Sequence, residues 1–360
     1  MSIRVLIVDD SAFMRKMIGQ ILSADPELEV AATARNGADA LRKLSALEID
    51  VITLDVEMPV MNGLETLRRI MADNPKPVIM LSSRTKQGSD ITLQALALGA
   101  VDFVPKPSGE ISLDIDLIAQ ELVAKVKAAV GAKLTPLPAA PVLRLPLPTV
   151  RPPAARTETV PGAADLVVAI GSSTGGPKAL EQVLVSIPRH VPAGFLLIQH
   201  MPQPFTKSFA DRLNSLGGLT VKEAEEGDLV QNGVALLAPG SFHMVVDEEK
   251  RVRLNQDPPV QFVRPSIDVT MSSLPRVFGS QILGVILTGM GRDGAYGMAR
   301  IKAAGGRTIA QDQQTSTIYS MPRAVAEEGN ADYILPVDRI GEAIVKLVQA
   351  MRGPSQPQSS

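Results

Sequence analysis

Carboxylic acids follow two of the apolar runs in the first third of the chain. Asp9 and Asp10 come directly after VLIV, and Asp55 comes directly after VITL. If both runs are strands of a parallel sheet, their carboxyl ends meet at one edge of that sheet and bring the acids together. Clustered carboxylates repel one another and need a cation, and their oxygen atoms favour Mg²⁺. We therefore expect a magnesium-binding acidic pocket at this edge.

Two further polar side chains are expected at the same edge. Ser82 follows the run PVIML, and Lys106 comes just after VDFV. A metal, a lysine, a hydroxyl and a free carboxylate together suit phosphoryl transfer onto Asp55. The alternative is that these residues are ordinary loop positions and helix caps. That alternative explains one acid at a strand end. It does not explain five matching residues at the ends of the expected strands, namely Asp9, Asp10, Asp55, Ser82 and Lys106.

A serine on a glycine turn marks a second candidate site. The apolar run LVVAI leads into GSSTGGPKAL, which fits G-x-S-x-G with Ser173 central. A helix beginning near Pro177 would direct its first amides at the turn, where they could stabilise an oxyanion. Ser172 stays open as an alternative nucleophile, although the spacing favours Ser173. A phosphate loop fits poorly, because Pro177 displaces Lys178 by one position and no hydroxyl residue follows the lysine. Taken alone, the turn could also be a helix cap without chemistry.

A nucleophilic serine needs a base, and the chain holds three histidines. His200 follows the buried-type run FLLIQ, so it should lie at the same sheet edge as Ser173 and is the best candidate. His190 lies between prolines and suits a surface position, whereas His243 could be structural or face a substrate. Asp293, in TGMGRDG after another apolar run, could orient the base. The order Ser, His, Asp differs from that of α/β-hydrolases, so that fold is not assumed.

The elements that must position these residues are apolar runs alternating with segments of helical spacing. In the first third the expected strands are residues 5–8, 30–34, 51–54, 77–81 and 101–104. The expected helices include residues 13–22, 38–47, 64–71 and 91–98. This alternation predicts an α/β fold with a doubly wound parallel sheet. The second site follows the same strand, turn and helix pattern, which predicts a second α/β domain with a mainly parallel sheet.

One change in composition divides the 360 residues. Residues 131–162 hold eight prolines, and proline removes amide donors, so we expect an extended linker there. The predicted organisation is a first domain at 1–130, the linker, a second domain at 163–352 and a disordered tail at 353–360. The first domain carries 14 Lys and Arg against 18 Asp and Glu, and residues 163–360 carry 18 against 19.

Composition also excludes several classes of function. The formal net charge of -2 argues against nucleic acid as a partner, because a nucleic-acid surface needs clustered positive charge. The absence of cysteine excludes disulfides, thiolate zinc sites and cysteine nucleophiles. No apolar run approaches 18 residues, so membrane insertion is not expected and a cytoplasmic protein is the default.

The motifs VLIVDDS, LDVEMPVMNG, VIMLSS and VDFVPKP resemble the receiver domain of two-component response regulators over residues 1–130. The resemblance implies a flavodoxin-like fold of five β/α units with Asp55 as the phosphoacceptor. It also implies that Asp10, Asp55 and the backbone carbonyl of Glu57 hold Mg²⁺, with Asp9 acting through water. Ser82 and Lys106 would contact the phosphoryl group, and Phe103 matches the aromatic switch position.

The motifs AIGSSTGGP, QHMPQPFTKSFADRLN, VKEAEEGD, APGSFHM and GVILTGMGRDGA resemble the catalytic domain of the chemotaxis protein-glutamate methylesterases. This resemblance implies Ser173, His200 and Asp293 as the catalytic residues. Thr174 and Met290 match as well, and Met290 would act through its backbone amide at the oxyanion site. No cofactor is expected for the esterase reaction.

Together the two resemblances imply a hydrolase regulated by phosphorylation, which demethylates glutamate methyl esters on chemoreceptors and deamidates selected receptor glutamines. The implied partners are methylated chemoreceptors as substrate and a chemotaxis histidine kinase as phosphodonor. A monomer, recruited from the cytoplasm to membrane receptor arrays, is expected. Two alternatives stay open: a response regulator with a DNA-binding output, which the charge opposes, and a silent interaction module with the esterase fold.

Overall fold

The chain separates into two compact units, which are described one at a time. A computed structural model describes residues 2–83, 85–106, 114–134 and 162–352. The division between the units falls at Met1–Ala140 and Pro141–Ser360. Most of the linker expected at 131–162 and all of the tail expected at 353–360 lie outside the described residues.

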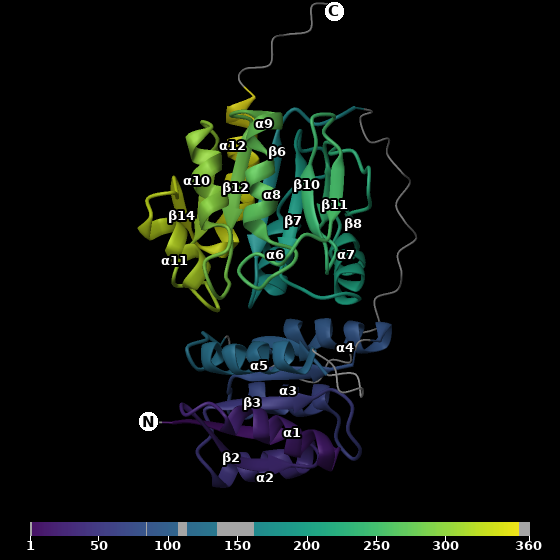
Figure 1. The fold of residues 1–360 in the computed structure, drawn as a ribbon, viewed down its shortest axis with the longest axis vertical. Coiled ribbons are helices and arrows are strands. Elements are labelled where there is room, and N and C mark those ends of the chain that lie inside the picture. Colours follow the sequence, from purple (N-terminus) through teal and green to yellow (C-terminus); the bar gives the residue numbers. More distant parts are fainter. Residues whose placement is uncertain (1, 84, 107–113, 135–161, 353–360) are drawn as a thin grey trace, which may run out of the picture. The chain divides into compact units, whose positions relative to one another are not determined.

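The N-terminal unit alternates five strands with five helices (Figure 1). Its elements are β1 (Ile3–Val8), α1 (Ala12–Ser23), β2 (Leu28–Ala34), α2 (Gly37–Ala46), β3 (Val51–Asp55), α3 (Gly63–Asp73), β4 (Val78–Ser82), α4 (Lys86–Ala97), β5 (Asp102–Pro105) and α5 (Asp114–Val130). All strand pairs are parallel, in the order β2-β1-β3-β4-β5. The predicted α/β fold with a doubly wound sheet is confirmed.

Buried strands and capped helices explain why this sequence folds this way. Strands β3 and β4 are buried at every position, as expected for strands covered on both faces. The side chains of Ser11, Asn36, Asn62 and Thr85 each accept a hydrogen bond from an amide in the first turn of the following helix. Helix α1 packs against α5, while α2 packs against α3 and α3 against α4. These two groups of helices cover the sheet.

The C-terminal unit is built around a larger sheet whose strands all pair in parallel. Its strands are β6 (Val167–Ser172), β7 (Gly194–Gln199), β8 (Thr220–Glu223), β9 (Val234–Leu237), β12 (Ile282–Ile286), β13 (Arg307–Gln311) and β14 (Tyr333–Leu335). Its helices are α6 (Gly176–Val185), α7 (Phe205–Ser215), α8 (Ile267–Ser273), α9 (Pro275–Phe278), α10 (Ala295–Ala303), α11 (Ser320–Glu327) and α12 (Val337–Met351). The strand order is β14-β13-β12-β6-β7-β9-β8, and a separate antiparallel pair joins β10 (His243–Val246) to β11 (Val252–Asn255). The expected mainly parallel α/β domain is confirmed.

The register of the three central strands brings their carboxyl ends together. Gly171 of β6 pairs with Ile286 of β12, and Ser172 pairs with Gln199 of β7. The residues that follow these strands, among them Ser173 and His200, therefore leave the sheet at the same edge.

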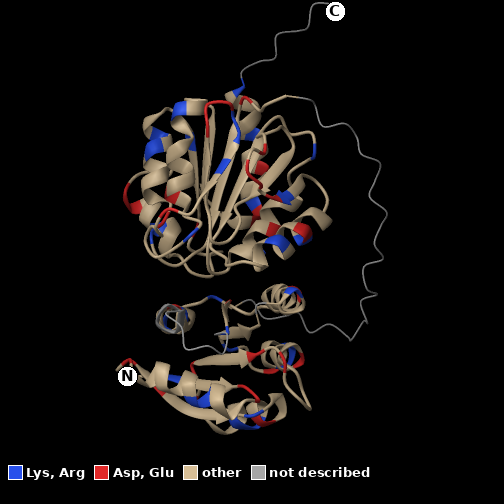
Figure 2. Ribbon diagram, turned by 45° about the vertical axis from the view of Figure 1, so that its right-hand side comes forward, with Lys and Arg blue, Asp and Glu red and all other residues tan. Residues whose placement is uncertain are grey.

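The strands at the centre of this sheet hold no charged residue. Strands β6, β7, β9 and β12 contain no Lys, Arg, Asp or Glu. Figure 2 shows the basic and acidic positions interspersed on the surrounding helices and loops. Among the described helices, none has both the length and the apolar character needed to cross a lipid bilayer.

Candidate functional site

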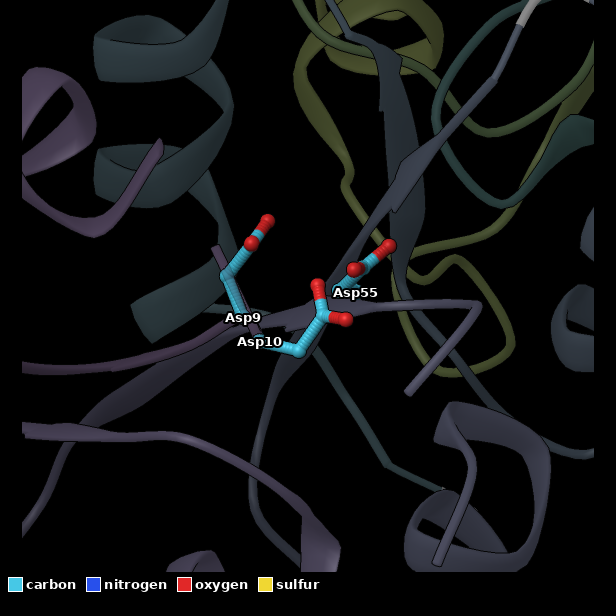
Figure 3. A group of neighbouring side chains, drawn as sticks. All are labelled: Asp9, Asp10 and Asp55. Atoms are coloured by element: carbon cyan, nitrogen blue, oxygen red, sulfur yellow. The ribbon is translucent and has the colours of Figure 1, made fainter. Parts of the chain in front are cut away.

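The three acids expected at the edge of the N-terminal sheet lie together. Asp9 and Asp10 follow β1, and Asp55 ends β3, the strand that pairs with β1. One carboxylate oxygen from each residue lies within 4.8 Å of the others, and Figure 3 shows the three side chains gathered at the strand ends. Asp9 and Asp55 are buried, whereas Asp10 is exposed. The cluster of acids is thus accessible to solvent at Asp10.

Lys106 supplies positive charge to this pocket. Its Nζ lies 2.9 Å from Oδ2 of Asp9 and 2.8 Å from Oδ2 of Asp55. Burial raises the pKa of Asp55 to about 6, and the repulsion by Asp9 adds to this, although Lys106 opposes the shift. Burial lowers the pKa of Lys106, but the two carboxylates outweigh that effect and leave it above its usual value.

These residues fit a magnesium ion. Three carboxylates within one ion's reach are the oxygen ligands that Mg²⁺ prefers, and a single lysine does not neutralise their combined charge. Asp10 and Asp55 could bind the ion directly. Glu57 lies beside them, since its amide donates to Oδ1 of Asp55 at 3.3 Å.

Ser82, expected to contact the phosphoryl group, and Phe103, expected as the aromatic switch residue, are both buried. The Ser82 hydroxyl is buried, where it donates to the Gly88 carbonyl at 3.2 Å and accepts from Thr92 at 2.7 Å. It is thus directed at α4. Phe103 is buried as well, and the ammonium of Lys125 lies 5.3 Å from its ring centroid.

At the edge of the C-terminal sheet, two adjacent serines lie in different surroundings. The Ser172 side chain is fully buried, and its hydroxyl donates to Oε1 of Gln199 at 2.7 Å. Ser173 is half-buried at the start of the turn, and its amide donates to the Thr288 carbonyl. Gly175 follows with a φ of 77°, a conformation that suits glycine, and α6 begins at Gly176.

His200 and Asp293 are in direct contact. The Nε2 atom of His200 lies 2.8 Å from Oδ2 of Asp293, and the histidine side chain is 11% exposed. A carboxylate only accepts, so Nε2 of His200 carries a proton and donates it in this hydrogen bond. In a neutral imidazole, Nδ1 is then the nitrogen that can act as a base. The His200 amide donates to the Ser172 carbonyl, which holds the base beside the serine turn.

Four donors surround the buried carboxylate of Asp293. Oδ1 accepts from the Ser266 hydroxyl at 2.9 Å and from the Asp268 amide at 3.0 Å. Oδ2 accepts from the Ile267 amide at 2.7 Å in addition to His200. Burial raises the pKa of Asp293, but these hydrogen bonds and the charge of His200 outweigh it, so the pKa lies below its usual value. The residue is held as an anion.

A second buried carboxylate, Asp268, fixes the loop that carries Asp293. Its Oδ1 accepts from the amides of Gly294 and Gly297 at 2.9 Å and 2.7 Å. Burial raises the pKa of Asp268 to about 6, the two amides oppose this, and the negative charge of Asp293 adds to it. The first turn of α10 is thereby attached to α8.

The remaining expected residues, Thr174 and Met290, border the serine turn. Thr174 is buried, and its carbonyl accepts from the Thr288 hydroxyl at 2.9 Å. Gly289, next to Met290, approaches Ser173 so closely that an added Cβ would lie 2.8 Å from the Cβ of Ser173. The loop after β12 therefore lies directly against the serine.

The other two histidines lie apart from this contact. His243 is buried, accepts from the Ser266 amide at Nδ1 and contacts the Pro258 carbonyl through Nε2. That arrangement answers the open question about its role in favour of a structural position. His190 is exposed, as expected for a surface loop.

Sequence reasoning missed three residues of this site. Gln199, Ser266 and Asp268 each contact Ser173, His200 or Asp293 by hydrogen bonds that span from 1 to 27 positions along the chain. Only Gln199 gave a local signal, since it is a polar residue at the end of a buried run. Ser266 and Asp268 look like an ordinary cap and first-turn acid of α8.

Comparison with known proteins shows which family each unit matches. The CheB methylesterase family matches residues 168–344, and the response regulator receiver domain matches residues 5–116. The chain is 51% identical over 351 residues to a protein-glutamate methylesterase/protein-glutamine glutaminase of Symbiobacterium thermophilum, covering 96% of this chain and 97% of the relative. It is 48% identical to the protein of the same name from Pyrococcus horikoshii, covering 98% and 95%.

A solved structure is also similar. The crystal structure of the Thermotoga maritima CheB methylesterase catalytic domain shares 43% sequence identity and has a TM-score of 0.49, covering 51% of this chain and 98% of that one. The similarity between whole chains confirms the expected two-domain hydrolase with a receiver. The chain belongs to the CheB methylesterase family, whose members join a receiver domain to a protein-glutamate methylesterase/protein-glutamine glutaminase domain.

Proposed function

We propose that this chain demethylates glutamate methyl esters on chemoreceptors and deamidates selected receptor glutamines, with Ser173, His200 and Asp293 as the catalytic residues. The observation that carries the proposal is the 2.8 Å contact between His200 and Asp293 at the sheet edge from which Ser173 also leaves. A nucleophile, a base and an orienting acid are the groups that acyl transfer requires.

The reaction begins when Nδ1 of His200 takes the proton of the Ser173 hydroxyl. The serine oxygen then bonds to the ester carbonyl carbon, and the amides of Thr174 and Met290 stabilise the negative oxygen. His200 returns the proton to the leaving oxygen, so that methanol departs and an acyl-enzyme remains. His200 then takes a proton from water, and the water oxygen bonds to the acyl carbon. The bond from that carbon to the Ser173 oxygen breaks as His200 passes the proton to the serine oxygen, which releases glutamate and restores both residues. With a glutamine substrate the leaving group is ammonia.

Asp293 supports these proton transfers without receiving a proton. Its carboxylate holds the Nε2 proton of His200 and stabilises the imidazolium that forms. The low pKa of Asp293 favours this role, since the carboxylate stays charged while the histidine changes state. No cofactor is required by this sequence of steps.

In the receiver we propose Asp55 as the residue that accepts a phosphoryl group from a chemotaxis histidine kinase. Asp10, Asp55 and the Glu57 carbonyl would hold Mg²⁺, with Asp9 acting through water; the ion would offset negative charge on the transferred group. Lys106 lies where it can pair with a phosphoryl oxygen, because its ammonium already contacts Asp55. Ser82 and Phe103 would respond by changing their contacts near α4 and β5.

Phosphorylation is proposed to raise esterase activity, with the unphosphorylated receiver restraining the catalytic domain. The chain would act as a monomer, recruited from the cytoplasm to membrane receptor arrays where its substrates lie. Such regulation needs a differential interaction of the two receiver states with the esterase.

The decisive experiment measures methanol release from membranes that carry methylated receptors, with and without a small phosphodonor. We expect release by the wild-type chain, stimulation by the phosphodonor, no release by Ser173→Ala and no stimulation of Asp55→Asn. A fluorophosphonate label on Ser173 distinguishes an enzyme from a silent module with the same fold. Turnover by Ser173→Ala would overturn the nucleophile, and a chain insensitive to the phosphodonor would overturn the regulation.

A further inference from the structure

Two aromatic side chains near Asp293 are exposed in a chain that has few aromatic residues. The sequence contains eight Phe, three Tyr and no Trp. Phe262 is 92% exposed and Tyr296 is 60% exposed, whereas Phe195, Phe205 and Phe209 are fully buried. Exposed aromatic residues are the type most enriched at the energetic centres of protein interfaces.

Phe262 stands at the tip of a strained turn. Val260 and Val263 exchange two backbone hydrogen bonds, of 3.2 Å and 3.0 Å, which close a two-residue hairpin loop. Both loop residues have positive φ, 50° at Gln261 and 66° at Phe262. Turns of this kind favour Asn and Gly, and a bulky side chain in the left-handed region is strained. Backbone strain of this kind is often found at functional sites.

The hairpin is attached to the catalytic acid through one carboxylate. Nε2 of Gln261 donates to Oδ2 of Asp268 at 3.1 Å, and the Asp268 amide donates to Asp293. Phe262 therefore follows Gln261, which is connected to Asp293 through two hydrogen bonds, one to Asp268 and one from Asp268.

The segment that carries Tyr296 is attached to the carboxylate of Asp268 as well. The amides of Gly294 and Gly297, which flank Ala295 and Tyr296, both donate to Oδ1 of Asp268. Asp268 thus accepts hydrogen bonds from residues next to both exposed aromatic residues, and these bonds hold the backbone of the two segments in place.

We propose that Phe262 and Tyr296 contact the polypeptide that carries the glutamyl methyl ester, and hold that polypeptide over Ser173. This inference rests on the proposed function. A glutamate side chain can reach Ser173 only if its own backbone lies against the protein surface around the site. The hydrogen bonds of Asp268 connect the segments that carry both aromatic side chains to Asp293. The contact binds apolar surface of the substrate protein and takes no part in bond making.

Two variants and one control test the contact in the full-length chain with a phosphodonor. Phe262→Asn removes the aromatic ring and keeps a residue that tolerates the left-handed backbone. Tyr296→Ala removes the second ring at an exposed helical position. Val185→Ala is the control, since Val185 is 62% exposed at the last position of α6, the end remote from the serine turn.

Each variant is assayed at varied concentrations of methylated receptor membranes and, separately, with p-nitrophenyl acetate, which is too small to span both positions. We expect the KM for receptor to rise about 5-fold for each variant, the change of a 1 kcal/mol contact, and further for the double variant. The kcat and the p-nitrophenyl acetate rate should stay at wild-type values, the melting temperature should not fall below the wild-type value, and Val185→Ala should match the wild type.

The outcomes separate the possible errors. An unchanged KM for receptor would overturn the inference, and an equal loss with both substrates would assign the residues to positioning of Asp293 instead. Faster ester hydrolysis by Phe262→Asn without a phosphodonor would show that the receiver occupies the surface. If the wild type releases no methanol, the proposed function fails. Co-sedimentation of each variant with receptor membranes then still tests the contact: loss of binding supports it, and wild-type binding overturns it.

Discussion

The hydroxyl of Ser172 donates a 2.7 Å hydrogen bond to Oε1 of Gln199 across the ends of β6 and β7. This bond fixes the orientation of the Gln199 amide, whose Nε2 donates to the carbonyl oxygens of Ser173 and His200 at 3.0 Å and 3.1 Å. One buried side chain therefore ties the backbone of the proposed nucleophile to that of the proposed base. The two adjacent serines therefore differ: Ser172 supports the geometry, whereas Ser173 is the proposed nucleophile.

The difference between the serines predicts different behaviour of their alanine variants. Ser173→Ala should reduce methanol release by about a thousandfold or more, to background, without loss of stability. Ser172→Ala should leave Ser173 reactive towards a fluorophosphonate, and should cost about 1 kcal/mol of stability because a buried hydrogen bond is lost. Labelling and thermal melting of both variants check this. Loss of labelling in Ser172→Ala with retention in Ser173→Ala would reverse the assignment.

Substitution of Asp293, the proposed catalytic acid, should disturb the hydrogen bond that orients His200, the proposed base. All four groups around Asp293 donate, so the amide of Asp293→Asn must place its NH₂ against donors or drive His200 into the wrong tautomer. We expect kcat to fall by about 10³ to 10⁴.

The control for this prediction is Asp211→Asn, which removes a carboxylate from an exposed pair with Lys207. It should leave kcat within twofold of the wild type, because exposed pairs contribute little. Steady-state kinetics on methylated receptors measure both variants. An Asp293→Asn enzyme with near wild-type kcat would mean that the carboxylate does not orient His200.

Local patterns predicted the sheet edges at both sites. Strands β1, β3, β6 and β7 are short runs rich in apolar residues, and each ends at a polar residue or is followed by one. The run at 51–54 becomes β3, and Asp55 follows from the strand alone. The supports of the second site could not be predicted in this way. Asp268 bonds to residues 25 to 29 positions away, and such a contact depends on how α8 and α10 pack, for which no short motif exists. Gln261 and Phe262 gave no turn signal either, since neither residue favours positive φ.

The raised pKa of Asp268 predicts how stability depends on pH. Its pKa is about 6 in the fold against 3.8 for a free aspartate, so between these pH values the folded state holds a proton that the unfolded state has lost. Stability from this group is therefore fully present below about pH 4 and is lost as pH rises through 6. Relative to Asp268→Asn, which cannot ionise, the wild type should lose about 3 kcal/mol over that window.

Calorimetry of the C-terminal transition in both chains, at several pH values from 4 to 8, measures this difference. The difference in unfolding free energy should change between pH 4 and 6 and stay constant above pH 7. A constant difference over the whole range would mean that Asp268 is already ionised at pH 4.

Removal of Lys106 should lower the free energy of unfolding of the receiver, and added Mg²⁺ should restore much of it. Lys106→Met leaves the carboxylates of Asp9 and Asp55 buried without their cation, and we expect a loss of about 2 kcal/mol, since the lysine side chain is itself 22% exposed. Millimolar Mg²⁺ should restore much of that loss, because an ion that binds only the folded state stabilises it by mass action. Arg69→Met, which removes an exposed pair with Glu65, should cost less than about 0.5 kcal/mol and should gain no more stability from Mg²⁺ than the wild type does. Thermal melting of the N-terminal transition, with and without Mg²⁺, measures both variants. If Mg²⁺ stabilises neither variant, the three carboxylates are not a metal site.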